Sequence, residues 1–236
     1  MWRRRLELAL LSAVCVVLVS CCPGKKMSHP GLMLKSHTTA NEATVYLMMN
    51  AMDGEAEMTM GSGTGVAIAR DNRSKETLIL TAGHVCVETY NPEFLISEIM
   101  VFTVSGEGYY SSVVDIDPNQ DLCLIKIKGM LPITKLAKEA PKTGEKVTYS
   151  GYPTGAYRPG TLHYFDGYMA GQDIMGNHLY NVPATGGSSG SPVYNKNGRI
   201  VGIISAVMIE FEHMTVAVGT ENVVNFVKAN KDWASK

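Results

Sequence analysis

From residue 43 onward the chain alternates short apolar runs with turn-forming residues. Eleven segments show either period-two alternation or a brief continuous apolar run, and Gly, Pro, Asn or Asp occupies most of the gaps. Strands at this spacing, without intervening helices, predict an all-β barrel or sandwich. The predicted strands are 43–50, 63–70, 77–82, 98–104, 111–117, 122–127, 146–152, 161–170, 191–195, 199–207 and 214–219.

The clearest helix signal lies at the C-terminal end. Thr220 is a candidate N-cap, and Glu221 suits the positive end of a helix dipole. Lys228 and Lys231 suit the opposite end, and one face is apolar, formed by Val223, Val224, Phe226 and Val227. No internal repeat or composition shift divides residues 43–236, which are predicted to form one domain.

The N-terminal segment differs from the rest of the chain. Residues 1–20 have the basic start and short apolar stretch of a secretory signal, too short for a typical membrane span. The sequence "LVSC" resembles the bacterial lipobox, which predicts lipidation of Cys21; an ordinary cleaved signal or an uncleaved anchor stays open. Residues 21–42 are polar and predicted to be a flexible tether. We therefore expect an exported lipoprotein, membrane-anchored and facing the periplasm or the cell exterior.

Composition and cysteine spacing exclude several other classes. The 236 residues are 45% hydrophobic and 18% charged, with a net charge of −1 and no basic run after the first five residues. We therefore expect no nucleic-acid partner. No CxxC pair or zinc-finger spacing occurs, so a structural zinc site is not expected. Within the predicted domain, Cys86 and Cys123 are interpreted as buried thiols in preference to a disulfide, which an exported protein could also form.

The stretch "ATGGSSGSPVYN", residues 184–195, carries candidate chemistry. A serine nucleophile needs an adjacent base and backbone N–H groups directed at the developing oxyanion. In a turn with three glycines, the N–H groups of Gly187 and Ser189 can converge on one oxygen. Ser189 has glycine two positions before it and one after it, which makes it the candidate nucleophile, with Ser188 and Ser191 as the alternatives.

A candidate base and a candidate carboxylate precede this turn. His84 follows an apolar strand and the small residues Ala-Gly, a position that can hold and expose an imidazole. Asp121 begins the strand "LCLIKI", where a carboxylate is costly unless it is paired. Asp115 and Asp117 compete for this role but precede Pro118 in a predicted solvated turn. The remaining histidines lie in the tether or in polar segments: His29, His37, His163, His178 and His213.

Taken in order, these motifs resemble a known family. "TAGHV", "DLCLIK" and "TGGSSGSPV" resemble the His, Asp and Ser motifs of chymotrypsin-fold serine proteases, over about residues 43–230. "SGYP", "SGSPVYNKNGRIVGI" and "VGTENVVNFVKAN" are similar to the bacterial glutamyl-endopeptidase branch, and HtrA-type proteases are related in pattern.

The resemblance implies two six-stranded antiparallel β-barrels, a C-terminal α-helix and an active site in the cleft between the barrels. His84 would be the general base, Asp121 its orienting partner and Ser189 the nucleophile, with the N–H groups of Gly187 and Ser189 forming the oxyanion hole. The implied reaction is hydrolysis of a polypeptide substrate through an acyl-enzyme, with no metal and no cofactor.

The chain departs from the family pattern at two places, and the first of them concerns specificity. The glutamyl branch binds a glutamate side chain through a histidine and a threonine, and the matching residues here are Ile204 and Ala184. We therefore expect an apolar primary pocket lined by Ala184, Ile204, Ser205 and Ala206. Ser188 also stands where the family usually has Asp or Asn.

Other functional classes fit the sequence less well. The main alternative is a protease-fold binding module that has lost turnover, against which the intact His, Asp and Ser set argues. If the protein were an adhesin or a structural lipoprotein, the ordered occurrence of the His, Asp and Ser motifs would be a coincidence. An α/β-hydrolase would need its histidine after the serine, whereas here His84 precedes Ser189.

Overall fold

The computed structural model describes residues 42–53, 56–86, 96–154, 156, 160–208, 210–211 and 213–230. The predicted leader, Cys21 and the tether up to residue 41 lie outside the described residues. Within the described part of the chain, no helix is long and apolar enough to span a bilayer.

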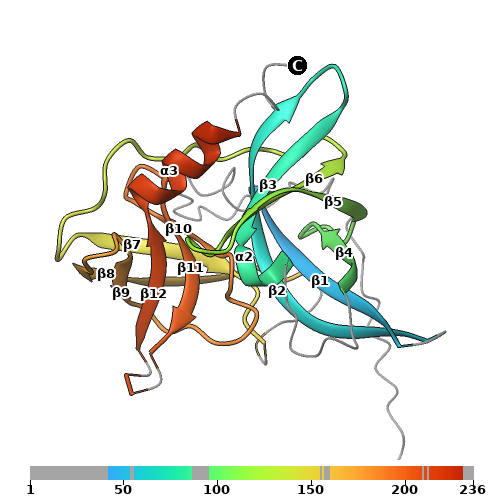
Figure 1. Cartoon of the computed structure of the whole chain (residues 1–236). Coiled ribbons are helices and arrows are strands. Elements are labelled where there is room, and N and C mark those ends of the chain that lie inside the picture. The colour runs from blue at the N-terminus through green and yellow to red at the C-terminus, as the bar shows by residue number, and fades with distance from the viewer. Residues whose placement is uncertain are drawn as a thin grey trace, which may run out of the picture. The chain divides into compact units, whose positions relative to one another are not determined.

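The first half of the domain is a closed antiparallel barrel with the strand order β1-β2-β3-β6-β5-β4, in which β4 pairs with β1 (Figure 1). Between β3 and β4, the short helix α2, Gly83–Cys86, follows β3 directly. The strands are β1 Thr44–Asp53, β2 Ala56–Asp71, β3 Glu76–Ala82, β4 Ile96–Phe102, β5 Gly108–Asp117 and β6 Leu122–Lys128.

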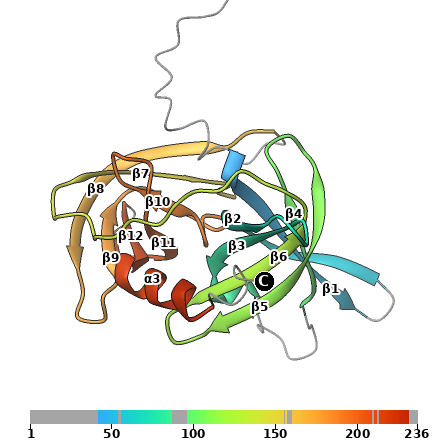
Figure 2. The ribbon, with the colours of Figure 1, turned by 90° about the horizontal axis from the view of Figure 1, so that it is seen from above.

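The second half repeats this architecture with the order β10-β11-β12-β9-β8-β7 and closes where β7 pairs with β10. The C-terminal helix α3, Thr220–Ala229, follows β12 and lies beside both barrels (Figure 2). The prediction of two six-stranded barrels and a C-terminal helix is thus confirmed. The strands are β7 Lys146–Gly151, β8 His163–Gln172, β9 His178–Asn181, β10 Pro192–Tyr194, β11 Ile200–Val207 and β12 Met214–Gly219.

Strand β9 is missing from the eleven strands predicted by pattern. It has only four residues, and His178 and Asn181 at its ends give no apolar run. Its partners β8 and β12 fix it in place by antiparallel pairing. Four residues are too few to reveal a period of two, so the sequence alone does not identify this strand.

The apolar residues of the alternating strands fill two clusters. The larger one contains fully buried side chains of the first barrel, such as Leu47, Ile79 and Leu124, and extends to Val223 and Phe226 of α3. The smaller one fills the second barrel: Val147, Tyr149, Met169, Tyr180, Val182, Val193, Val201, Ile204 and Ala217, with Ala137. The larger cluster also includes residues of the second barrel, namely Tyr194, Ile200, Ile203 and Val218. The apolar face of α3 is therefore part of a core that joins the two barrels.

The predicted N-cap of α3 is wrong. The cap is Gly219, which makes no side-chain hydrogen bond there, and Thr220 is the first helical residue. The Thr220 hydroxyl instead donates to the Val201 carbonyl oxygen at 2.6 Å and anchors the helix to β11. Glu221 and Lys228 occupy the first and last turns, as the helix dipole favours.

Cys86 and Cys123 form a disulfide, which corrects the preference for two free thiols. Cys123 on β6 lies opposite Thr81 in the β3–β6 ladder, and α2 starts two residues after Thr81. The short helix therefore turns back toward β6. Sequence spacing could not decide this pairing, because it does not determine on which side of the sheet each thiol lies.

We expect the disulfide to stabilise the first barrel substantially. It joins residues 37 positions apart, a loop for which the chain-entropy relation gives about 4 kcal/mol. Dithiothreitol should therefore shift urea-induced unfolding of the wild-type protein to a lower midpoint. The double variant Cys86→Ala/Cys123→Ala should unfold at that lower midpoint with or without reductant. An unchanged wild-type midpoint after complete reduction would contradict this prediction.

Candidate active site

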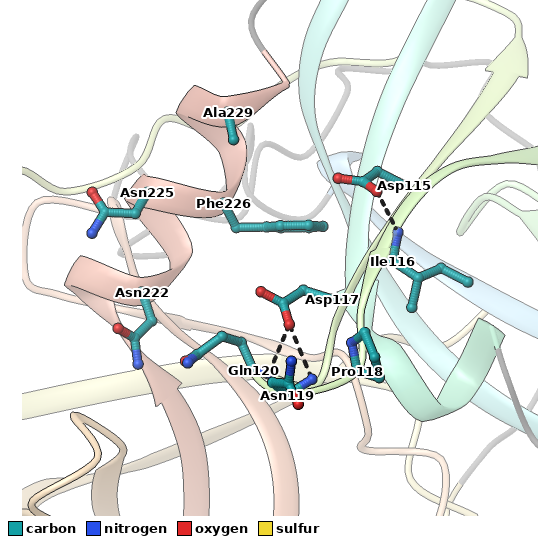
Figure 3. Close-up of a pocket in the computed structure, with 10 residues that line it drawn as sticks. All are labelled: Asp115, Ile116, Asp117, Pro118, Asn119, Gln120, Asn222, Asn225, Phe226 and Ala229. Carbon is teal, nitrogen blue, oxygen red and sulfur yellow. Dashed lines mark hydrogen bonds between the residues drawn. The ribbon is translucent and has the colours of Figure 1, made fainter.

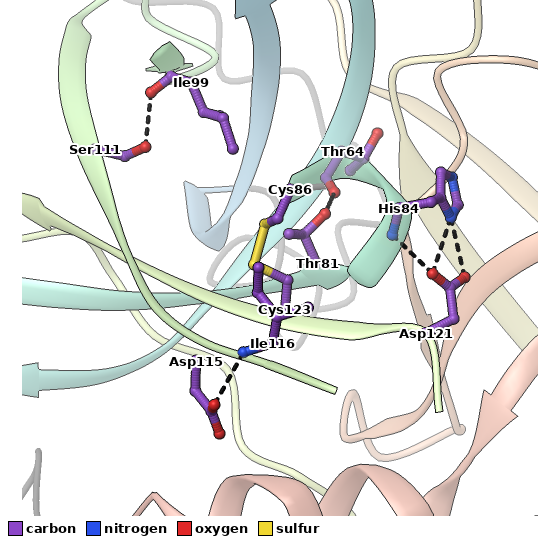
Figure 4. The surroundings of a disulfide bond; sticks show 10 residues. All are labelled: Thr64, Thr81, His84, Cys86, Ile99, Ser111, Asp115, Ile116, Asp121 and Cys123. Carbon is purple, nitrogen blue, oxygen red and sulfur yellow. Dashed lines mark hydrogen bonds and ion pairs between the residues drawn. A yellow bond between two sulfur atoms is a disulfide. The ribbon is translucent and has the colours of Figure 1, made fainter. Parts of the chain in front are cut away.

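His84 and Asp121 come together at one end of the first barrel. The Asp121 carboxylate accepts a hydrogen bond from the His84 backbone N–H at 2.8 Å, and both of its oxygens lie 3.0 Å from His84 Nδ1 (Figure 4). Asp121 has a φ of 52°, a left-handed conformation that Asp tolerates better than most residues. At Gly83, a Cβ would lie 3.0 Å from the Asp121 backbone, so glycine allows α2 to begin against this turn.

Ser205 is a third member of this cluster, contributed by the second barrel. Its hydroxyl donates a short hydrogen bond to Asp121 Oδ2. The β11–β12 register shifts between Ile204 and Ala206, and such a bulge re-aims the side chain at the irregular position. Ser205 was predicted to line a substrate pocket, and the structure shows its hydroxyl directed to Asp121. No sequence signal marks this role, because the two residues are 84 positions apart.

These contacts determine the charge of Asp121. Burial alone would raise the pKa of the Asp121 carboxyl, but the hydrogen bonds from His84 and Ser205 outweigh burial and lower that pKa below its usual value. Asp121 is therefore ionised at neutral pH. An ionised carboxylate accepts the Nδ1–H of a neutral imidazole and leaves Nε2 as the nitrogen that can take up a proton.

The glycine-rich turn at residues 185–191 adopts a conformation that requires its glycines. Gly187 and Gly190 have φ values of 82° and 83°. At Gly187 a Cβ would lie 2.5 Å from the Tyr152 carbonyl oxygen, and at Gly190 it would lie 2.0 Å from the Thr64 carbonyl oxygen. Larger residues are excluded at both positions by backbone angle and by space.

Two backbone N–H groups of this turn remain available to a ligand. The Ser188 N–H donates to the Thr185 carbonyl at 2.9 Å, and the Gly190 N–H donates to the Ile204 carbonyl at 2.7 Å. In the described part of the chain, the N–H groups of Gly187 and Ser189 have no such acceptor. The turn thus leaves unpaired the two donors that the sequence predicts for an oxyanion hole.

Accessibility separates the three serines of the turn. Ser188 and Ser191 are 1% and 0% exposed, whereas Ser189 is partly exposed. The Ser188 hydroxyl also accepts a hydrogen bond from the Thr185 N–H at 3.3 Å. Ser189 is therefore the one of the three that a substrate can reach.

The serine turn lies against the strand end that leads into His84. The Ser189 carbonyl oxygen accepts a hydrogen bond from the Thr64 N–H of β2 at 2.8 Å. At Gly190 a Cβ would lie 2.2 Å from Thr81 Oγ1 and 3.0 Å from the Ala82 nitrogen, two residues before His84. The predicted nucleophile, base and carboxylate are thus all at the junction of the two barrels.

The remaining predicted pocket residues have different environments. Ala184 is half-buried, Ala206 is exposed, and Ile204 is 1% exposed within the second core cluster. The segment before the turn is held by Tyr149, whose hydroxyl donates to the Pro183 carbonyl at 2.6 Å. Burial raises the pKa of Tyr149 to about 12, so this phenol remains a donor at neutral pH.

The competing carboxylates lie on the α3 side of the β5–β6 turn. Asp117 accepts hydrogen bonds from the backbone N–H groups of Asn119 and Gln120 at 3.0 and 3.1 Å, while Asp115 accepts one from Asn230 at 2.8 Å. Both line a pocket of about 600 Å³ between this turn and α3 (Figure 3). Asp117 therefore shapes the turn that leads to Asp121, whereas Asp115 links β5 to the C-terminal end of α3.

The other histidines have no comparable arrangement among the described residues. His178 is 1% exposed, its Nδ1 lies 2.8 Å from the Tyr180 hydroxyl, and burial lowers its pKa. His163 is half-buried and His213 is exposed, while His29 and His37 lie outside the described residues. In the part of the chain that the structure describes, His84 is the histidine that contacts a carboxylate.

This fold and this cluster define a class of protein. The chain matches the trypsin-like peptidase domain over residues 63–203, which is more than half of its length. It therefore belongs to the trypsin-like peptidase family, and the predicted membership of this family is confirmed.

Individual relatives agree with this assignment. The chain is 29% identical over 150 residues to a probable periplasmic serine endoprotease, DegP-like, from Pseudomonas fluorescens, covering 61% of this chain and 29% of that protein. It is 32% identical over 130 residues to a glutamyl endopeptidase from Staphylococcus aureus, covering 53% and 37%. The matches thus span less than two fifths of either relative's length.

A solved structure shows the same fold. The serine endoprotease from Yersinia pestis superimposes with a TM-score of 0.67 at 21% identity, covering 82% of this chain and 64% of that structure. The two-barrel architecture is therefore the one found in these proteases.

Proposed function

We propose that this protein is a serine endopeptidase that hydrolyses peptide bonds through Ser189, His84 and Asp121. The observation that carries the proposal is the His84–Asp121 contact, in which both carboxylate oxygens face the same imidazole nitrogen at 3.0 Å. This contact favours Nε2 as the proton acceptor, and the partly exposed Ser189 lies on the turn beside the same strand end.

Each chemical step then has a residue to perform it. His84 Nε2 takes the proton from Ser189 as its oxygen attacks the carbonyl carbon, and Asp121 stabilises the resulting imidazolium. The developing oxyanion accepts hydrogen bonds from the Gly187 and Ser189 N–H groups. His84 returns the proton to the leaving amine, and a water molecule then hydrolyses the acyl-enzyme by the same sequence of steps.

The experiment that tests this function is active-site labelling of the protein lacking residues 1–20. A fluorophosphonate probe should label the folded protein, and peptide mass spectrometry should map the label to Ser189. Casein should be cleaved by the same preparation, and prior labelling should abolish the cleavage. A folded protein that neither reacts nor cleaves would instead be the protease-fold binding module, and a label on Ser188 or Ser191 would mean that the nucleophile is misassigned.

We propose further that the primary specificity pocket is apolar. Ala184 and Ile204 carry no hydrogen-bonding group, and the Ser205 hydroxyl is bonded to Asp121. None of these side chains offers a donor to a glutamate carboxylate. A peptide library should therefore show cleavage after apolar residues, and cleavage concentrated after glutamate would overturn this part of the proposal.

The predicted export and lipid anchor are also proposals. The DegP-like relative is named as periplasmic, and the sequence "LVSC" supports lipidation of Cys21. Intact mass spectrometry of the protein purified from bacterial membranes should show a diacylglycerol-sized addition at Cys21, and Cys21→Ala should release the protein from the membrane fraction. A protein of unmodified mass in the membrane would exclude the lipid anchor.

A further inference from the structure

Thr64 is a buried threonine of the first barrel that bonds to the serine turn of the second. It lies on β2, is 0% exposed, and pairs with Tyr46 in the β1–β2 ladder. Its hydroxyl donates to the Gly187 carbonyl oxygen at 2.8 Å, and its backbone N–H donates to the Ser189 carbonyl oxygen at 2.8 Å. One residue thus holds the carbonyl groups of both residues whose N–H groups form the proposed oxyanion hole.

The hydroxyl of Thr64 is used as an acceptor as well. The Tyr152 N–H, just after β7, donates to Thr64 Oγ1 at 3.0 Å. The hydroxyl proton is therefore directed to Gly187, because the lone pairs face Tyr152. Figure 4 also shows the Thr81 hydroxyl bonded to the Thr64 carbonyl, at 2.8 Å, from the strand that ends before His84.

Gly187 is the residue of the turn that most needs such a contact. Glycine has the widest choice of backbone angles, and a rotation at Gly187 would turn its N–H away from the substrate oxygen. The peptide group before Gly187 is held because the Gly186 carbonyl accepts the Thr154 N–H at 2.6 Å. The peptide group after it is held by the Thr64 hydroxyl. The N–H of that second peptide group belongs to Ser188 and donates to the Thr185 carbonyl at 2.9 Å. Without the Thr64 hydroxyl the Gly187 carbonyl oxygen loses its donor, and this peptide group is held at its N–H alone.

We propose that Thr64 is a positioning residue for the oxyanion hole, which it acts on through Gly187 without touching the substrate. This inference rests on the proposed peptidase function and adds to it a residue that the sequence motifs do not include. Loss of the Thr64 hydroxyl should therefore weaken binding of the transition state more than binding of the substrate. The reason is that the Gly187 N–H donates its strongest hydrogen bond when the oxyanion forms.

The test compares variants of Thr64 on a fluorogenic peptide that the wild-type protein cleaves. Thr64→Val keeps the shape but removes the hydroxyl, and it should lower kcat by about 100-fold, the range found when one oxyanion donor is lost, with little change in KM. Affinity for an aldehyde of the same peptide, which forms a tetrahedral adduct with Ser189, should fall in parallel with kcat. Thr64→Ser should restore both.

Two controls separate positioning from general destabilisation. Thr44 is an equally buried threonine of β1, and its hydroxyl bonds Ser150 and Tyr194 of the second barrel. Thr44→Val should lower the unfolding temperature without the loss of kcat. If Thr64→Val does not fold, the kcat values of Thr64→Ser and Thr64→Ala are compared instead, because these two variants differ by one oxygen atom.

The outcomes distinguish this proposal from the function on which it rests. The positioning role is refuted if Thr64→Val loses no more kcat than Thr44→Val. Where Thr64→Val does not fold, the same conclusion follows if the difference in kcat between Thr64→Ala and Thr64→Ser is no larger than the loss in Thr44→Val. In either case Thr64 is structural and the wild-type activity stands. A wild-type protein that neither cleaves nor reacts with fluorophosphonate refutes the peptidase function itself.

Discussion

Replacing Ser189 with alanine should lower kcat for peptide hydrolysis by about 10⁶-fold, because the variant keeps the base and the oxyanion donors but has no atom to form the acyl-enzyme. Ser189 is the partly exposed serine of its turn, so no neighbouring hydroxyl is placed to substitute for it. The loss should appear in kcat, with substrate binding largely retained. Steady-state kinetics and active-site labelling on the folded variant measure both quantities.

Ser191 provides a matched control in the same turn. Its hydroxyl is fully buried and has no hydrogen-bond partner among the described residues, so Ser191→Ala should leave kcat close to wild type. The double variant Ser189→Ala/His84→Ala should be no slower than Ser189→Ala alone, because base and nucleophile act as one unit. Activity that survives in Ser189→Ala but disappears in Ser191→Ala would identify Ser191 as the nucleophile.

The candidate site illustrates which features a sequence can reveal. His84, Asp121 and Ser189 each stand in a local motif whose residue types have a chemical reason, so they could be proposed without coordinates. Ser205 and Thr64 could not, because each contributes one hydroxyl to a partner more than eighty positions away. Their roles arise from the way the two barrels meet, which local patterns do not encode.

The same distinction holds for the fold. Strands with clear alternation, and the amphipathic face of α3, were predictable because burial imposes a period on the sequence. The four-residue β9 and the Gly219 cap were not, since both depend on pairing with distant strands. The cysteine pair was only partly predictable. The sequence shows that both cysteines lie near the proposed catalytic residues, but the bond between them depends on how α2 turns toward β6.

Asp121→Asn tests the orienting role of the carboxylate with the least disturbance of the backbone. Asparagine has the same shape and tolerates the left-handed φ of 52° at this position, so the variant should fold. The carboxylate accepts hydrogen bonds from the His84 backbone N–H, from His84 Nδ1 and from Ser205. An amide has only one accepting oxygen, and we expect its NH₂ group to face Nδ1.

Replacing a carboxylate oxygen with an NH₂ group changes the tautomer of the His84 imidazole. If the amide introduced by Asp121→Asn donates to Nδ1, the His84 proton moves to Nε2, which can no longer accept the proton of Ser189. We therefore expect kcat to fall by about 10⁴-fold at neutral pH. The unfolding midpoint should fall only by the stability that the ionised carboxylate contributes through its lowered pKa. The position of the proton can be read directly from the ¹⁵N chemical shifts of the two imidazole nitrogens, which should exchange their assignments in the variant.

Ser205→Ala is the matched control, because it removes one donor to Asp121 but keeps the carboxylate and both contacts with His84. Its kcat should fall far less, and the pKa of Asp121 should rise because burial is then less well opposed. The stability that an Asp of lowered pKa contributes is present above its ordinary pKa and is lost as the pH falls through the folded value. Ser205→Ala should therefore lose less stability than wild type on acidification, and its loss should be complete at a higher pH. Equal kcat values for wild type and Asp121→Asn would show that the carboxylate does not orient His84, whatever the distance between them.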